Sequence, residues 1–143
     1  TLRQWVIAGC IGSAATLVLV AFLGQIGPDA PLLPAVIGMG FFNGMFAVAA
    51  IGSMMALAGE GREEREGTRM GLWGAAQAIA AGFGGLLGAA LVDVLRTVLT
   101  DPSAFGSVFL LEACLYIASA FMAVRIMDRR PQMPPSAAAV PGE

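Results

Sequence analysis

The sequence predicts an all-α, polytopic membrane protein with four transmembrane helices. Four apolar runs, each longer than twenty residues, occupy about two thirds of the 143 residues. These runs cover residues 5–26, 32–58, 70–95 and 105–126. A hydrocarbon core ~30 Å thick is crossed by ~20 helical residues, so each run is long enough to span it.

Composition supports the same fold class. The chain is 57% hydrophobic and 13% charged, with a mean hydropathy of +0.78, whereas soluble domains carry about 25% charged residues. Lipid offers no partner to a free backbone N–H or C=O, so the runs must be helices, and they are too long for barrel strands of ~9–11 residues. We expect residues 1–130 to form one four-helix transmembrane domain. The Pro/Ala-rich segment 131–143 has too little apolar surface to order itself and is expected to be a flexible tail.

The arginines are distributed unevenly over the predicted loops. Seven of the eight flank the runs on one side: Arg3, Arg62, Arg65, Arg69, Arg125, Arg129 and Arg130. Arg96 alone falls on the other side. Because loops rich in Arg and Lys stay on the cytoplasmic side, both termini are predicted to be cytoplasmic.

Turn chemistry separates the elements in order. The first run ends at Gly27-Pro28-Asp29-Ala30-Pro31, a turn so short that the first two helices must lie side by side. The second and third runs are joined by a Glu/Arg-rich loop at 59–69, which fits either a solvated turn or a docking surface for a partner. Asp101-Pro102-Ser103 is a start signal for the last helix.

Small residues form stripes along the second and third spans. Helices in lipid associate through close backbone approach, which small residues allow. The stripes include Gly40 and Gly44 on the second span and Gly74, Ala78 and Gly85 on the third. We expect these residues to form helix-packing surfaces. The alternative is that the smooth faces receive a flat ligand or a partner helix instead of each other.

Charged residues inside the spans are candidates for function, since each costs free energy in the membrane. Glu112 is expected about 10 Å from one end of the last span, with Arg96 as the guanidinium nearest in depth. Without a cationic partner, its carboxyl is expected to be protonated. Asp93 lies three residues before Arg96 and competes for it, which predicts an outer-side Asp93–Arg96 ion pair.

Two amides are the other polar candidates. Asn43 and Gln77 each flank the small-residue stripe of their own helix, which places both toward the bundle interior. We expect each to make an interhelical hydrogen bond worth ~1 kcal/mol or less.

Catalytic and metal sites are not expected. The chain has no histidine and no lysine, and it carries no pairing of a nucleophile with a base, no phosphate loop and no cluster of ligands. Its two cysteines lie inside apolar runs and are expected to be buried small hydrophobes. We therefore predict no enzyme activity, no catalytic residue, no metal site and no nucleic-acid partner.

The segment 67–80, GTRMGLWGAAQAIA, resembles the PucC/LhaA family, the bacteriochlorophyll-delivery branch of the major facilitator superfamily. Residues 88–93 and 105–113 are similar to the C-terminal end of the same family. The resemblance implies a twelve-span protein whose last four helices correspond to this chain. It also implies a role in assembling light-harvesting complexes, in the intracytoplasmic photosynthetic part of the bacterial inner membrane of purple phototrophs.

The resemblance implies partners and cofactors as well. The partners would be membrane lipids, light-harvesting antenna polypeptides and the reaction centre, and the cofactors bacteriochlorophyll, carotenoid or lipid. With no histidine, a magnesium ligand would have to be an oxygen donor such as Glu112, Asn43 or Gln77, and Trp73 could contact a macrocycle face.

Three functions remain open at this point. The first is a non-catalytic subunit or assembly factor of a light-harvesting/reaction-centre complex. The second is a bacteriochlorophyll carrier that delivers pigment to antenna polypeptides. The third is half of a small-molecule or proton transporter that uses Glu112.

Overall fold

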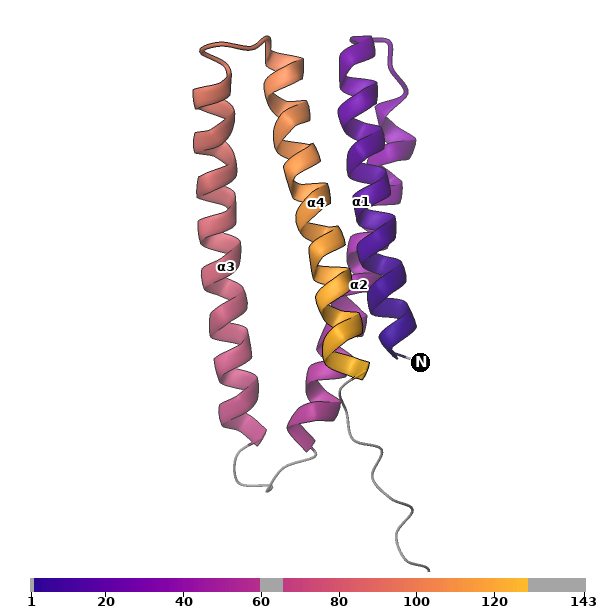
Figure 1. Ribbon diagram of the computed structural model, residues 1–143, viewed down its shortest axis with the longest axis vertical. Helices are drawn as coiled ribbons and strands as arrows, with labels where there is room; N and C mark the ends of the chain where they lie inside the picture. Colours follow the sequence, from indigo (N-terminus) through magenta and orange to yellow (C-terminus); the bar gives the residue numbers. More distant parts are fainter. Residues whose placement is uncertain (1, 60–65, 129–143) are drawn as a thin grey trace, which may run out of the picture.

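A computed structural model of the chain describes residues 2–59 and 66–128 and consists of four long helices (Figure 1). Helix α1 spans Leu2–Ile26, α2 spans Leu32–Gly59, α3 spans Glu66–Leu95 and α4 spans Asp101–Asp128. Each of the four is long and apolar enough to cross a membrane, so the chain is an all-α, multi-pass membrane protein. The charged loop at 60–65 and the predicted flexible tail at 131–143 lie outside the described residues.

Every predicted span lies within an observed helix, but α3 and α4 each begin four residues earlier than the apolar runs do. An apolar run marks the part of a helix that sits in hydrocarbon, whereas backbone hydrogen bonding continues into the polar flank. At α4 the Ala104 N–H already donates to the Thr100 carbonyl at 2.9 Å, and Pro102 is accommodated in the first turn. Glu112 lies eleven residues, ~16 Å, from the start of this helix but seven residues, ~10 Å, from the start of the apolar run, so its expected depth in the hydrocarbon is unchanged.

The turn between α1 and α2 depends on a glycine. Gly27 adopts φ 110°, the left-handed conformation that commonly ends a helix. The Ala30 N–H then donates to the Gly27 carbonyl at 3.1 Å, and Leu32 begins the next helix. This tight reversal sets α2 directly beside α1, as the sequence predicted.

Helix α1 forms the centre of the bundle and packs against both α2 and α4 (Figure 1). Its buried residues follow the 3.6-residue period: Val6, Gly9, Cys10, Ser13, Ala14, Thr16, Leu17 and Ala21. Two core clusters lie along this stripe, one around Cys10 and the other around Leu17. Both clusters are completed by small residues of α2 or α4, which let the backbones approach closely.

Glycines on α1 set its distance from α2. A Cβ on Gly9 would lie 2.8 Å from backbone atoms of Phe46, and a Cβ on Gly12 would overlap the ring of Phe42. On the other side of α1, Gly106 of α4 packs against Ala21 and Gln25. The absence of a side chain at these three positions therefore determines how closely the three helices pack.

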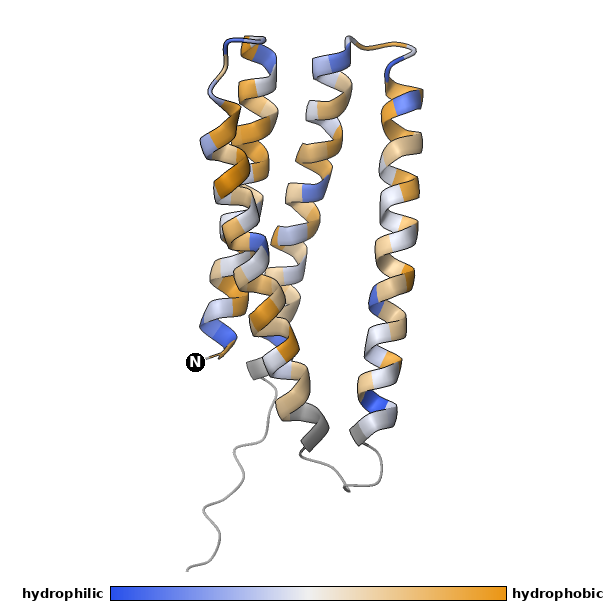
Figure 2. Cartoon of the chain, turned by 180° about the vertical axis from the view of Figure 1, so that it is seen from behind, coloured by the Kyte–Doolittle hydropathy of each residue, from blue (hydrophilic) through white to orange (hydrophobic). Residues whose placement is uncertain are grey.

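Helix α3 stands to one side of the other three helices (Figure 1). Only 6% of its most apolar window is buried, against 44% for α1. Its largest apolar side chains are exposed, including Leu72, Phe83, Leu86 and Leu87. The hydropathy colouring shows apolar residues over most of its length, with polar residues mainly toward its ends (Figure 2). Helix α3 thus offers an apolar surface that the other residues of 2–59 and 66–128 do not cover.

Candidate functional site

The predicted small-residue stripes lie on open faces of the structure. Nothing lies within 4 Å of where a Cβ would be at Gly40, Gly44, Gly74 or Gly85, and Ala78 is exposed. The stripes on α2 and α3 do not pack against each other here, because α3 stands away from the bundle. Their role in helix packing stays a prediction, and any helix that covers them is not among the described residues.

A polar junction joins α1, α2 and α4. The Tyr116 hydroxyl of α4 donates to Asn43 Oδ1 of α2 at 3.1 Å, and the Tyr116 ring meets the Phe46 ring edge-on at 6.1 Å between centroids. On α1, the Ser13 hydroxyl is buried beside Tyr116 and makes no hydrogen bond of good geometry within the described residues. Asn43 thus takes part in an interhelical hydrogen bond, and its partner is a tyrosine.

Replacing Tyr116 by phenylalanine should destabilise the bundle only slightly. The substitution removes one interhelical hydrogen bond, worth about 0.6 kcal/mol in membrane proteins, and keeps the aromatic contact with Phe46. Unfolding of the purified protein by SDS in mixed micelles would measure this loss. If Asn43→Leu loses the same stability as Tyr116→Phe, and the double variant loses no more than either one, the loss is due to the hydrogen bond between Tyr116 and Asn43. Additive losses would contradict this assignment.

Glu112 lies one helical turn before Tyr116, close enough for its charge to act on the Tyr116 hydroxyl. Its side chain is exposed and makes no hydrogen bond or ion pair with any residue in 2–59 or 66–128. The same ranges hold no group of three or more Cys, Asp or Glu residues arranged to bind a metal ion. Within the described chain, the Glu112 carboxyl is thus an intramembrane oxygen ligand without a protein partner.

The ion pair at the α3–α4 end of the bundle differs from the predicted Asp93–Arg96 pair. Arg96 pairs with Asp101, through Nε to Oδ1 at 2.8 Å and Nη2 to Oδ2 at 3.1 Å, and not with Asp93. The Arg96 N–H still donates to the Val92 carbonyl at 2.9 Å, but helix α3 ends at Leu95 and the turn that follows brings Asp101 within reach of the guanidinium. The hydrogen bonds that Arg96 donates to Asp101, followed by the negative charge of Asp101, raise the pKa of Arg96, and Asp93 has the smallest effect. Glu112 makes no ion pair with Arg96 in the described part of the chain.

Gln77 and Trp73 both lie on α3. Gln77 is exposed and makes no interhelical hydrogen bond within the described part of the chain, whereas Trp73 is half-buried. The structure therefore does not bring Gln77 to Asn43. Both residues lie on the helix that the other described helices leave largely uncovered.

Some polar residues at the contacts were not identified from the sequence. Tyr116 is the only tyrosine of the chain and lies four residues after Glu112, which is a usable signal for a polar face. Gln25 of α1 donates from Nε2 to the Pro102 carbonyl of α4 at 2.9 Å. No pattern within one helix indicates this bond, because the two residues are 77 positions apart.

Comparisons with known proteins give a family match and a curated relative. A family model described as "PUCC protein" matches residues 1–131. A curated relative from Rhodobacter capsulatus, named "Bacteriochlorophyll synthase 44.5 kDa chain", is 62% identical over 130 residues. That match covers 91% of this chain and 30% of the relative, so the chain spans less than a third of the relative's length. No solved structure gives a significant match.

Proposed function

Because the chain belongs to the PUCC protein family, we propose that it acts as a non-catalytic membrane subunit or assembly factor of a bacterial light-harvesting/reaction-centre complex. The name of the 62% identical relative refers to bacteriochlorophyll, the pigment of such complexes. The site of action would be the intracytoplasmic photosynthetic membrane.

The observation that carries this proposal is the uncovered α3 helix. A membrane helix may expose large apolar side chains to lipid, but lipid contact does not require a stripe of small residues. On α3, Gly74, Ala78 and Gly85 are open, and a partner helix could approach the backbone closely there. We propose that antenna polypeptides or other helices of the complex pack against this face.

Affinity purification tests the subunit or assembly role. The tagged full-length protein, solubilised in mild detergent from phototrophically grown cells, should recover antenna polypeptides in fixed stoichiometry. Recovery of the protein only in free fractions would contradict the proposal. Synthase activity in the purified full-length protein would contradict its non-catalytic part.

Pigment carriage is a second candidate, and the unpartnered Glu112 carboxylate is the observation that favours it. A carboxylate oxygen is a hard donor of the kind that magnesium prefers. The bond from Tyr116 uses the Asn43 amide oxygen, so the Asn43 amide nitrogen has no hydrogen-bond partner in the described chain. This nitrogen and the Tyr116 hydroxyl supply further polar groups for the proposed site. Such a site would bind bacteriochlorophyll through its metal, with apolar side chains against the ring.

Glu112→Gln should lower the pigment content of a carrier by roughly tenfold, equivalent to ~1.4 kcal/mol, because an amide oxygen is a weaker ligand than a carboxylate. The measurement is bacteriochlorophyll absorbance per mole of purified protein after incubation with the pigment. Asp93→Asn is the matched control, since it neutralises another exposed carboxylate in a span. Equal pigment content in both variants, or a wild-type protein that takes up no pigment, would exclude Glu112 as the ligand.

A further inference from the structure

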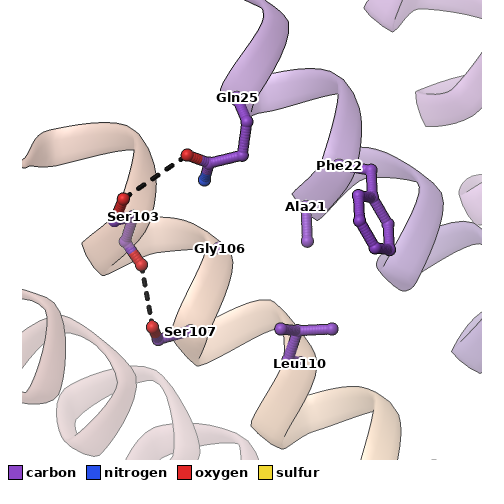
Figure 3. A pocket seen from close by; sticks show the side chains of 7 residues that line it. All are labelled: Ala21, Phe22, Gln25, Ser103, Gly106, Ser107 and Leu110. Carbon is purple, nitrogen blue, oxygen red and sulfur yellow. Dashed lines mark hydrogen bonds between the residues drawn. The ribbon is translucent and has the colours of Figure 1, made fainter.

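A groove between α1 and α4 lies at the end of the bundle where α1 stops and α4 starts (Figure 3). Its volume is about 280 Å³. Three polar side chains line it near the helix ends, namely Gln25, Ser103 and Ser107. Phe22 and Leu110 line its deeper part. The groove is therefore polar toward the membrane surface and apolar toward the membrane interior.

The polar lining lies at the depth of the lipid–water boundary. Helix α1 is 25 residues long, or ~38 Å, and exceeds a ~30 Å hydrocarbon core by about 4 Å at each end. Gln25, the second-last residue of α1, and Ser103, the third residue of α4, both fall within this excess. Ester carbonyls of glycerolipids occupy the same boundary. Phe22 and Leu110 lie below it, at the depth of acyl chains.

The groove has hydrogen-bonding capacity to spare and no net charge. Gln25 Nε2 donates one hydrogen to the Pro102 carbonyl at 2.9 Å, and its second hydrogen has no partner among the described residues. Gln25 Oε1 accepts from Ser103 Oγ at 3.4 Å, and Ser107 Oγ donates to the Ser103 carbonyl at 2.8 Å (Figure 3). The nearest ions, Arg96 and Asp101, neutralise each other. The second hydrogen of Gln25 Nε2 can therefore be donated to a neutral acceptor such as a carbonyl.

Size limits the occupant. Sites for whole drug-sized ligands measure roughly 300–1,000 Å³, so this groove has room for the ester and the adjoining part of one acyl chain and is too small for a tetrapyrrole ring. We propose that the groove binds one acyl chain of a membrane glycerolipid, with the ester carbonyl accepting a hydrogen bond from Gln25 Nε2. This site is separate from the α3 face and from Glu112, and it does not depend on the proposed function.

A second groove on the other side of the Ala21–Gly106 contact provides an internal control. Its volume is about 290 Å³, and its lining includes Gly24, Pro102 and Phe105, without Gln25 or either serine. A Cβ on Gly24 would meet nothing within 4 Å, so Gly24→Leu should fill the second groove without disturbing the fold.

The test uses the full-length protein in phosphatidylethanolamine vesicles. One probe is a diacyl phosphatidylethanolamine with a photoreactive diazirine midway along one chain, and the other is its diether analogue, which lacks the ester carbonyls. The diacyl probe should crosslink to the peptides that contain Phe22 and Leu110, about two- to fivefold more than the diether probe. Gln25→Leu should abolish this difference, while Gly24→Leu should preserve it.

Two outcomes would overturn the proposal. Equal crosslinking by the ester and ether probes would mean that the groove is solvated by lipid without recognition of the carbonyl. Displacement of the diacyl probe by a long-chain isoprenoid ester at a lower concentration than by unlabelled glycerolipid would assign the groove to a different ester. Circular dichroism would verify that the Gln25→Leu variant is folded before its crosslinking is interpreted.

Discussion

Gly9→Ala is expected to destabilise the helix bundle by about 1–3 kcal/mol, and Gly9→Leu should prevent α1 and α2 from packing. The added Cβ would lie 2.8 Å from the backbone N and Cα of Phe46, and these atoms cannot move unless the whole helix moves. The higher helix propensity of alanine is worth at most about 1 kcal/mol, so the steric cost should dominate. Thermal or SDS unfolding of the purified protein in mild detergent would measure the effect.

Gly44→Ala is the matched control for this prediction. Gly44 lies on α2 in the same kind of stripe, but a Cβ there would meet nothing within 4 Å. The stability of the Gly44→Ala protein should stay unchanged or rise slightly. Gly12→Ala tests the same contact in another way, because its obstacle is the Phe42 ring, and Phe42→Leu should rescue it. Equal stability of Gly9→Ala and Gly44→Ala would contradict the packing of α1 against α2.

Gly74→Leu and Gly85→Leu should leave the four-helix unit folded and strongly reduce its recovery with a photosynthetic complex. A side chain at either position meets nothing within 4 Å in this chain, so the substitution costs the unit itself little. A partner helix packed on the small-residue stripe would be pushed away, and close backbone contacts would be lost. We expect at least a tenfold drop in co-purified antenna polypeptide, equivalent to ~1.4 kcal/mol.

The measurement is quantitative immunoblotting of antenna polypeptides after affinity purification of the full-length protein. Gly24→Leu is the matched control, because it adds the same side chain at an open position on α1, away from α3. Circular dichroism and detergent stability of each variant would establish that the fold is intact. Normal recovery of antenna polypeptides with both glycine variants would contradict the proposal that α3 is the docking face.

The sequence predicts the local features of this structure better than its tertiary contacts. Four spans and their helical state follow from run length and from the need to satisfy backbone hydrogen bonds in lipid. The α1–α2 turn follows from Gly27 and its neighbouring prolines. The predicted Asp93–Arg96 pair was not found, because the spacing rule considers residues of one helix only, whereas Arg96 pairs with Asp101 across the turn that follows α3.

The candidate sites show the same division. Glu112 could be singled out from the sequence because a carboxylate inside an apolar run is costly whatever surrounds it. Its place one turn before Tyr116 could also be counted along the helix. The bond from Tyr116 to Asn43 and the bond from Gln25 to Pro102 each join residues more than seventy positions apart. Only the packing of α2 and α4 around α1 brings these groups within reach of one another.

The sequence by itself determined that this chain crosses a membrane as four helices and that small residues would control their association. Tertiary structure decided which small residues do so: Gly9, Gly12 and Gly106 are packed, while Gly44, Gly74 and Gly85 lie open. The physical reason is that lipid solvates every apolar helix face about equally, so the hydrophobic effect does not choose between them. Fit between neighbouring helix surfaces makes the choice, and that fit exists only once α1 lies between α2 and α4.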